Sequence, residues 1–281
     1  MNTVVVHNPR SGTAVATDEL KRYFAEAGIT ITDLIDITDD ESSQRIRTHA
    51  VSGATIAAIG GDGTLSNVAK HIIGTDGVFA PLPGGTLNHF TKDAGVNQDL
   101  KTAVMNLQSA KPRRVDVATV NGTVFLNNSS MGVYPLSLHT RKRFEDKLGK
   151  WPAAVIGSLR AFVRFRLYDV EINGQEFRTP FLFVGNNDYH IGASGERTSL
   201  NEGKLCVYLI ASDRRRDIIR LILSAIAGRL REQPDFIFFK TEQLTIHTKN
   251  ARSVSVATDG EVTRMHAPLT YQSVPAGLTI I

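Results

Sequence analysis

The sequence predicts an α/β N-terminal domain with a parallel sheet over residues 1–120, and a mostly antiparallel β-sandwich domain over residues 121–281. Expected strands and helices alternate up to residue 120, which is typical of βαβ units around a parallel sheet. Beyond that point short strand-like runs dominate, separated by turn residues. The 281 residues are 42% hydrophobic, which suffices for the cores of two domains. The last strand is free to return to the first domain.

In the first domain the apolar periodicity predicts each element in turn. The expected strands span residues 3–7, 30–36, 54–59, 77–82 and 113–120. The expected helices span about 17–27, 41–51, 65–73 and 98–109.

In the second domain the expected strands span residues 123–128, 169–172, 177–185, 204–210, 243–248, 254–257 and 269–272. Asn121-Gly122 and Asn173-Gly174 are favourable hairpin turns. They favour antiparallel pairing of the strands on either side.

The most informative segment is Gly60-Gly61-Asp62-Gly63-Thr64, between an expected strand and an expected helix. Its glycines allow positive φ and close approach to a ligand, and the following helix N-terminus favours an anion. Asp62 would repel phosphates unless a cation or a donor stood between them, so it suggests a metal ion or a charge network. The alternative is a plain strand-to-helix turn with Asp62 as the N-cap. A Walker-type GxxxxGK[ST] loop is absent, so any phosphate site is of another type.

Two other expected strands end in similar turns. Asn8-Pro9-Arg10-Ser11-Gly12 follows strand 3–7, and Pro83-Gly84-Gly85-Thr86-Leu87-Asn88 follows strand 77–82. Ligands of open α/β sheets bind just outside the carboxyl ends of the strands. We therefore expect the three turns to converge on one nucleotide.

These three segments and the late Asp259-Gly260-Glu261 resemble the four signatures of the diacylglycerol kinase catalytic family, which includes bacterial lipid kinases and is similar to sphingosine and ceramide kinases. The resemblance covers nearly the whole chain, in the family's order. GGDGT alone is shared with NAD kinases, whereas its combination with NPxSG and DGE is specific. The resemblance implies an NAD kinase/diacylglycerol kinase-like α/β domain, a β-rich lipid-substrate domain and an active site in the cleft between them. It also implies Mg²⁺-dependent transfer of the γ-phosphoryl group of ATP to a neutral lipid alcohol, with diacylglycerol as the leading acceptor.

The resemblance further implies which residues hold the nucleotide. They are Asn8, Pro9, Arg10, Ser11, Gly12, Thr38, Gly60, Gly61, Asp62, Gly63, Thr64, Asn67, Gly85, Thr86 and Asn88. Asn88-His89-Phe90 departs from the family's commoner Asn-Asp-Phe, so no acidic role is carried over to position 89.

By the same resemblance an acidic residue of the late motif takes the proton from the lipid hydroxyl, as an alcohol acceptor requires. Asp259 is our first choice for this general base and Glu261 our second. The residues alone leave an ordinary hairpin open, because Asp-Gly is a favoured turn.

Asp116 lies in the alternating strand 113–120, where a charged residue normally faces solvent. The resemblance instead places it in a catalytic acidic network with Asp62 and Asp259. Such a network would hold Mg²⁺ mainly through water, as this ion prefers.

A second, structural Mg²⁺ is implied near residues 199–205, with Glu202 as the carboxylate ligand and Ser199 and Lys204 as carbonyl ligands. The chain has Asn201-Glu202 where the family pattern has Asp-Asp. A plain β-turn before strand 204–210 is the alternative, because Asn and Gly readily form turns.

Composition indicates a cytoplasmic protein. No apolar run approaches the roughly 18 residues of a transmembrane helix, and the first residues lack the basic start of a signal peptide. The single Cys206 excludes an intramolecular disulfide and a zinc cluster.

The formal net charge is +4, and much of the positive charge is concentrated in one segment. His139–Arg166 holds eight bases among Trp151, Phe162 and Phe165, and Asp213–Arg231 is a second basic, apolar segment. Both suit an anionic membrane surface, at the periphery of the inner membrane face. Each is also compatible with an amphipathic core helix whose basic face is solvated, which is the commoner role of such a helix. No nucleic acid is expected, because no recognition motif accompanies the bases; a homodimer stays open.

Two rival functions remain. An NAD kinase-like small-molecule kinase shares GGDGT, but NPxSG, DGE and the basic segments argue against it. A non-catalytic nucleotide-binding regulator would be expected to lose acidic residues, whereas Asp62, Asp116, Asp259 and Glu261 are all present.

Overall fold

The computed structural model describes residues 2–9, 15–132, 167–189, 197–212, 214, 216–217, 220–221, 224 and 229–281. The chain forms two compact units. Unit 1 contains Met1–Val117, Ser199–Glu202 and Val274–Ile281, and unit 2 contains Ala118–Thr198 and Gly203–Ser273.

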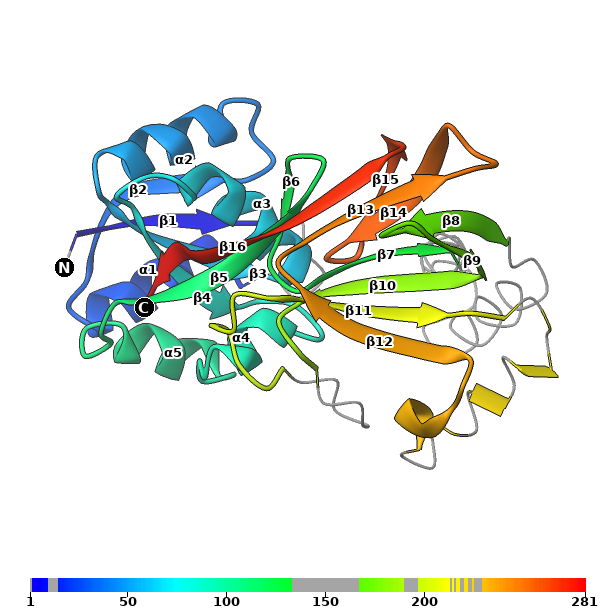
Figure 1. The fold of residues 1–281 in the computed structure, drawn as a ribbon. Coiled ribbons are helices and arrows are strands. Elements are labelled where there is room, and N and C mark those ends of the chain that lie inside the picture. Colours follow the sequence, from blue (N-terminus) through cyan, green and yellow to red (C-terminus); the bar gives the residue numbers. More distant parts are fainter. Residues whose placement is uncertain are drawn as a thin grey trace, which may run out of the picture. The chain divides into compact units, whose positions relative to one another are not determined.

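Unit 1 is built on a parallel sheet, which confirms the predicted α/β class (Figure 1). Its strands follow the order β2 (Thr30–Asp36), β1 (Asn2–His7), β3 (Thr55–Gly60) and β4 (Val78–Pro83). The end of β16 (Leu269–Ile280) pairs with β4 through Ile280 and Phe79. The first residues of β5 (Arg113–Val120) also belong to this unit.

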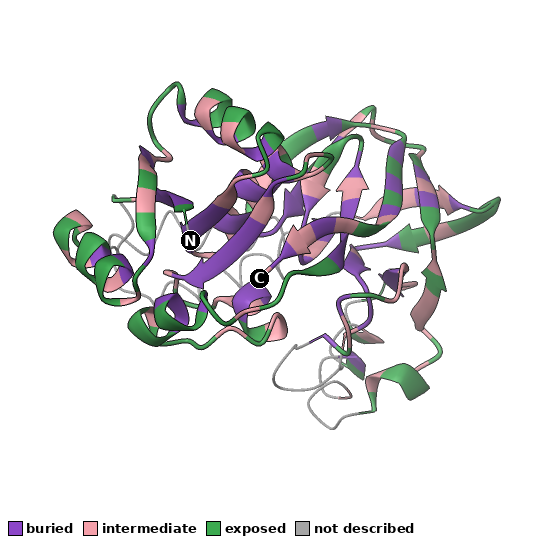
Figure 2. Ribbon diagram, turned by 90° about the vertical axis from the view of Figure 1, so that its left-hand side faces the viewer, coloured by how far each residue is buried: buried purple, intermediate pink, exposed green. Residues whose placement is uncertain are grey.

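Helices cover both faces of the parallel sheet. α1 (Thr17–Glu26) and α5 (Leu100–Asn106) pack together on one face, and α2 (Ser42–Val51) and α3 (Asp62–Ile72) on the other (Figure 1). α1 buries Leu20 and Phe24 one turn apart, as an amphipathic helix does. Buried residues concentrate on the strands, while the helices expose their outer faces (Figure 2).

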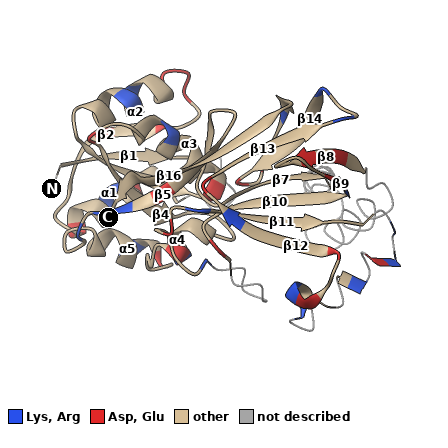
Figure 3. Ribbon diagram, in the orientation of Figure 1, with Lys and Arg blue, Asp and Glu red and all other residues tan. Residues whose placement is uncertain are grey.

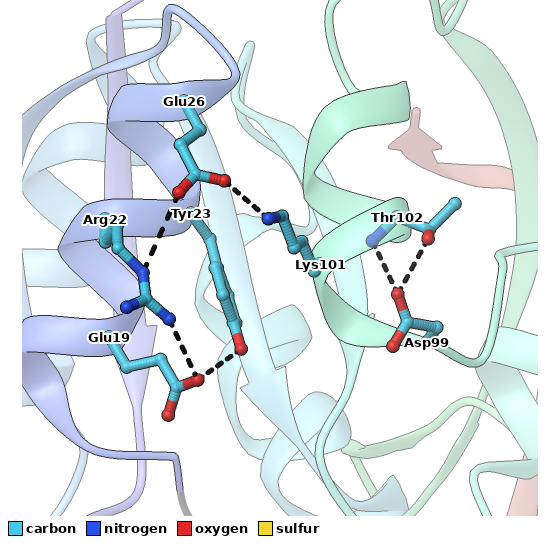
Figure 4. A network of polar contacts seen from close by, with 7 residues as sticks. All are labelled: Glu19, Arg22, Tyr23, Glu26, Asp99, Lys101 and Thr102. Carbon is cyan, nitrogen blue, oxygen red and sulfur yellow. Dashed lines mark hydrogen bonds and ion pairs between the residues drawn. The ribbon is translucent and has the colours of Figure 1, made fainter.

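A surface network joins α1 to α5 (Figure 4). Lys101 Nζ lies 2.7 Å from Glu26 Oε2, and Arg22 pairs with the same carboxylate. Asp99 caps α5 by accepting hydrogen bonds from the backbone N–H and hydroxyl of Thr102, at 2.9 and 2.7 Å. Exposed ion pairs contribute little to the free energy of folding. The buried side chains between these helices therefore supply most of the stability of their packing.

Unit 2 contains a six-stranded antiparallel sheet. Its order is β12 (Phe236–Thr241), β11 (Leu205–Ile210), β10 (Phe181–Asn186), β7 (Asn128–Gly132), β14 (Ser253–Thr258) and β15 (Glu261–His266). The central strands β7, β10 and β11 contain no charged residue (Figure 3). This suits strands buried on both faces.

A second antiparallel layer completes the sandwich of unit 2. It contains β6 (Thr123–Phe125), β13 (Gln243–Thr248), β8 (Tyr168–Ile172), β9 (Gln175–Thr179), the end of β5 and the start of β16. Side chains from both layers form one core, among them Phe125, Val184, Val207, Ile246 and Tyr271. The predicted β-sandwich is therefore confirmed.

Three two-residue hairpins have positive φ at both central residues, as type I′ turns require. They are Asn121-Gly122, Asn173-Gly174 and Asp259-Gly260. The first two confirm predicted turns. The third shows that the late Asp-Gly pair is a hairpin turn, whatever else its side chain does.

Several elements differ from the expected ones. The short helix α4 (His89–Asp93), the 3₁₀ helix Leu230–Glu232 and strands β7, β12 and β15 were not predicted. The expected strand 177–185 is two strands separated at Pro180, which has no N–H for a ladder. No helix in the described parts of the chain is both long and apolar enough to cross a membrane.

Candidate active site

The loops after β3 and β4 pack backbone against backbone. Gly84 donates its N–H to the carbonyl of Gly60 at 3.1 Å. A Cβ on Gly84 would lie 2.7 Å from the nitrogen of Gly60, and one on Gly85 would lie 2.4 Å from Cα of Gly61. Side chains at these positions would push the two loops apart.

The expected positive φ of the GGDGT glycines is wrong. Neither Gly60 nor Gly61 has positive φ; Gly61 is extended, with φ −80° and ψ 176°, and Gly63 is already helical. Helix α3 begins at Asp62, earlier than predicted. A Cβ on Gly60 would instead lie 2.4 Å from Cβ of Thr64, and one on Gly61 would lie 3.3 Å from Cα of Gly85, so limited space rather than positive φ favours glycine here.

Asp62 holds the loop that follows β4. Its carboxylate accepts hydrogen bonds from the backbone N–H groups of His89 at 3.1 Å and Phe90 at 2.9 Å, at the start of α4. Asn88, with φ 53°, accepts a bond from the N–H of Gly85 at 2.9 Å. Asp62 is not the N-cap of its own helix, because Gly61 occupies that position. Its negative charge lies instead at the N-terminus of a neighbouring helix, a favourable location.

A pocket of about 200 Å³ lies at the carboxyl ends of β1, β3 and β4. Three of the predicted nucleotide residues, Asn8, Gly85 and Asn88, line it. The other lining residues are His7, Val15, Leu20, Ile59, Pro83, Gly84, Gln98 and Leu100. Burial lowers the pKa of His7, although Asp36 opposes the shift.

The remaining predicted nucleotide residues are distributed around these loops. Pro9 follows Asn8, and Thr64 and Asn67 lie in α3. Thr86 is exposed in the β4–α4 loop. Thr38 lies in an exposed turn after β2, where its N–H and hydroxyl donate to Asp36. Arg10, Ser11 and Gly12 lie outside the described residues.

Asp116 is buried rather than solvent-facing, with only 3% of its surface exposed. Its carboxylate accepts a hydrogen bond at 2.8 Å from the N–H of Ala276, which has the unusual φ of 50°. Asp116 therefore stabilises the backbone of β16 within unit 1. Among the described residues no group of three His, Cys, Asp or Glu side chains is arranged to hold a metal ion.

In unit 2, Asp259 occupies the turn between β14 and β15 and is 9% exposed. Its Oδ2 accepts a bond from the N–H of Leu126 at 2.7 Å, and its Oδ1 accepts bonds from Asn127 at 2.8 Å and Asn128 at 3.0 Å. Three consecutive backbone N–H groups therefore fix the orientation of this carboxylate. Glu261, in contrast, is exposed at the start of β15.

Sequence reasoning missed a second acidic centre in unit 2. Asp188 accepts a bond from the Tyr208 hydroxyl at 2.8 Å and pairs with Lys240 at 3.0 Å and Arg231 at 3.3 Å. Burial works to raise the pKa of Asp188, but bonds from Lys240 and Tyr208 outweigh it and hold the pKa below its usual value. Burial raises the pKa of Tyr208.

Residues 199–204 have the geometry of a turn. Ser199 Oγ accepts a bond from the N–H of Asn201 at 3.0 Å, and Gly203 has φ 66°. The carbonyl of Lys204 accepts a bond from Asn187 at 2.9 Å, and its ammonium pairs with Glu242. The metal site expected at Ser199, Glu202 and Lys204 stays a prediction.

The predicted membrane segments cannot be placed. His139–Arg166 and much of Asp213–Arg231 lie outside the described residues.

Comparison with known proteins identifies both parts of the chain. Residues 2–120 match the diacylglycerol kinase catalytic domain, and residues 137–281 match the YegS C-terminal NAD kinase beta sandwich-like domain. A probable YegS-like lipid kinase of Pseudomonas syringae pv. tomato is 28% identical over 230 residues, covering 78% of this chain and 73% of the relative. The diacylglycerol kinase of Bacillus subtilis is 23% identical over 275 residues, covering 92% and 88%.

The fold is shared with solved structures. A crystal structure of a diacylglycerol kinase from Bacillus anthracis str. Sterne matches with a TM-score of 0.70 and 22% identity, covering 100% of this chain and 96% of that one. With family matches across both units, the chain belongs to the diacylglycerol kinase-like lipid kinase family, in its two-domain form with a YegS-type C-terminal domain.

Proposed function

We propose that this protein is an ATP-dependent lipid kinase that phosphorylates the hydroxyl of a neutral lipid, with diacylglycerol as the first acceptor to test. The observation that carries the proposal is the close packing of the Gly60–Gly61 and Gly84–Gly85 loops beside the start of α3. A helix N-terminus behind a tight glycine loop favours phosphate groups. Membership of a kinase family makes ATP the natural donor.

Asp62, Asp116 and Asp259 are the residues we propose to hold Mg²⁺, mainly through water. Carboxylate oxygens are the ligand type that Mg²⁺ prefers, and these three side chains are fixed by backbone N–H groups. Bound Mg²⁺ would neutralise charge that develops on the transferred phosphoryl group. The protein's own contribution is to hold the carboxylates in position.

Either Asp259 or Glu261 is proposed as the general base, with Asp259 the first choice. Three backbone N–H donors hold the Asp259 carboxylate in a fixed position, as a positioned base requires. Glu261 is exposed to solvent, so its carboxylate is less constrained than that of Asp259. Asp259→Asn should lower kcat by about 10²-fold or more if Asp259 is the base. If only Glu261→Gln has this effect, the role passes to Glu261.

The test of the proposed function is transfer of label from γ-labelled ATP to a panel of acceptors: diacylglycerol, sphingosine, ceramide and NAD. We expect labelled phospholipid and no labelled NADP. Label on NAD alone would support the rival small-molecule kinase. Nucleotide binding without transfer to any acceptor would support a non-catalytic regulator.

We propose that the protein is cytoplasmic and lies at the periphery of the membrane. The basic segment His139–Arg166 would give it access to a substrate in the bilayer. Binding to vesicles should rise with anionic lipid and fall with salt, since each base near the surface contributes about 1 kcal/mol. Reversal of Arg160 and Arg164 to Glu should lower activity on vesicles but spare a short-chain, water-soluble acceptor. Equal loss on both acceptors would mean damage to the fold or active site, and no loss would remove the proposed role.

A further inference from the structure

The segment Leu126–Asn128, which runs from the end of β6 into the first residue of β7, is held from two sides by charged groups that are far apart in sequence. Asp259 accepts hydrogen bonds from its N–H groups, and Arg197 donates to its oxygens. Arg197 is 8% exposed and Asn127 3%, so the contacts are buried. All of these residues belong to unit 2.

Arg197 and Asp259 meet at the same peptide group. Nη1 of Arg197 donates to the carbonyl oxygen of Leu126 at 2.6 Å. The N–H of Asn127, on the other side of that peptide bond, donates to Oδ1 of Asp259 at 2.8 Å. Nη2 of Arg197 also donates to the side-chain Oδ1 of Asn127 at 3.0 Å.

The next peptide group, Asn127–Asn128, is oriented in the same way, with its carbonyl towards hydrogen-bond donors and its N–H towards Asp259. The carbonyl oxygen of Asn127 accepts bonds from the N–H of Asn186 and the hydroxyl of Tyr189, both at 2.9 Å. The N–H of Asn128 donates to Oδ1 of Asp259 at 3.0 Å. A β-bridge joins Tyr189 to Arg197 and so keeps these two donors, to Asn127 and to Leu126, beside each other.

This arrangement joins a buried cation to a buried carboxylate through the backbone. A guanidinium on a carbonyl oxygen polarises the peptide and strengthens the bond that its N–H donates. A buried carboxylate is costly unless donors compensate its charge. The donor strength available to Asp259 therefore depends in part on Arg197.

We propose that Arg197 is a positioning residue of the active site, which holds the Asp259 carboxylate in place by fixing and polarising the Leu126–Asn127 peptide. The inference rests on the proposed function, in which Asp259 serves phosphoryl transfer as base or in the Mg²⁺ network. Arg197 acts through the peptide and need not touch either substrate.

Arg197→Met removes the charge and keeps much of the side-chain volume. We expect kcat on diacylglycerol to fall by about 10-fold or more with KM for ATP unchanged, because small misplacements of a catalytic group have effects of this order. Arg197→Lys keeps the charge and should recover part of the loss. Arg178→Met is the matched control, since Arg178 pairs with Asp169 on the surface of the same unit, and it should leave kcat unchanged.

A double-mutant cycle with Asp259→Asn tests the mechanism. If Arg197 acts through Asp259, Arg197→Met should change kcat less than about twofold in the Asp259→Asn background, because residues that act as a unit are not additive. The same fold loss from Arg197→Met on top of the residual activity of Asp259→Asn would overturn this inference and leave the proposed function standing. Wild-type kcat in Asp259→Asn would overturn both the role of Asp259 and this inference.

Hydrogen exchange supplies a readout that does not depend on finding the acceptor. In folded Arg197→Met the amides of Leu126, Asn127 and Asn128 should exchange faster, and in Arg197→Lys they should stay close to wild type. If Arg197→Met does not fold, Arg197→Lys replaces it in the kinetic cycle. Unchanged exchange and unchanged kcat in the folded variants would overturn the proposal.

Discussion

At the scale of single residues, three of the aspartates predicted to be functional share one feature, which is that backbone N–H groups fix each carboxylate. Asp62 binds the start of α4, Asp116 binds Ala276, and Asp259 binds three consecutive amides. Such bonds orient a carboxylate and stabilise its charge. Their rigidity suits groups that must stay in place while charge moves on a substrate.

Asp62→Asn should lower stability as well as turnover. An amide can accept from one of the N–H groups of His89 and Phe90 but presents an NH₂ to the other. One part-buried donor then loses its partner, which costs about 1–3 kcal/mol. We expect a lower midpoint in urea unfolding and near-complete loss of transfer. The exposed Asp76→Asn, in a turn of the same unit, is the control; equal midpoints for the two variants would contradict the role of Asp62 in holding α4.

Gly85→Ala should separate the two glycine loops. Its Cβ would lie 2.4 Å from the backbone Cα of Gly61, which no side-chain rotation can relieve. Overpacking of this kind costs about 1–3 kcal/mol, and the nucleotide should bind more weakly. Gly61→Ala is the matched comparison, because its Cβ would meet Gly85 Cα at 3.3 Å. ATP titration and thermal unfolding should rank Gly85→Ala as the more damaging change.

At the scale of elements, α5 depends on its N-cap. Asp99 accepts bonds from both the backbone and the hydroxyl of Thr102, and the pKa of Asp99 is lowered chiefly by the hydroxyl bond. Asp99→Ala should lower Tm by about 2 °C or more, the usual effect of losing a cap in a chain of this size. Asp18→Ala, in the first turn of α1 where no side chain caps the helix, is the control. Equal Tm values would mean that Asp99 contributes no cap.

The elements that the sequence predicts well are those with a strong local pattern. β2, β5 and β13 have the expected bounds, and the Asn-Gly turns lie where their sequences place them. β15 has little apolar alternation, because it is an edge strand of its sheet, and so it gave no signal. α4 is too short for helical periodicity, and its N-terminus is stabilised from a distance by Asp62.

The same division explains the site. The glycine loops could be found because parallel strands place their carboxyl ends along one edge. The packing that requires the glycines could not be predicted, because it depends on contact between loops that are more than twenty residues apart in the sequence. Arg197 lies in a loop with no periodic pattern, and only the fold brings it to Leu126. Asp188 likewise gains its partners from strands β11 and β12.

At the scale of the whole molecule, local rules are violated mainly where the function is proposed. Asp116, Asp188, Arg197 and Asp259 are charged residues in buried positions, where uncompensated charge is costly. Each is compensated by backbone groups or by an opposite charge. Natural sequences keep such costly arrangements chiefly at functional sites. Unit 2 should therefore be tested for catalytic residues, and not only for residues that pack against the lipid substrate.

Stability at alkaline pH should reveal the buried tyrosines of unit 2. Burial raises the pKa of Tyr271 to about 12, although its bond to Ser129 opposes the shift. A folded-state value above the ordinary 10 means that the folded protein holds the proton more tightly than the unfolded chain. The stabilisation is therefore fully present below pH 10 and is lost as the pH rises towards 12.

We expect the free energy of unfolding to fall above pH 10 with a slope of up to roughly 1.4 kcal/mol per pH unit for each such tyrosine. Urea unfolding at a series of pH values measures this slope. Tyr271→Phe should reduce it, while part should remain from Tyr208, whose pKa is also raised by burial. A slope that Tyr271→Phe does not change would mean that Tyr271 keeps its proton equally well in the unfolded chain, against its complete burial in the sandwich core.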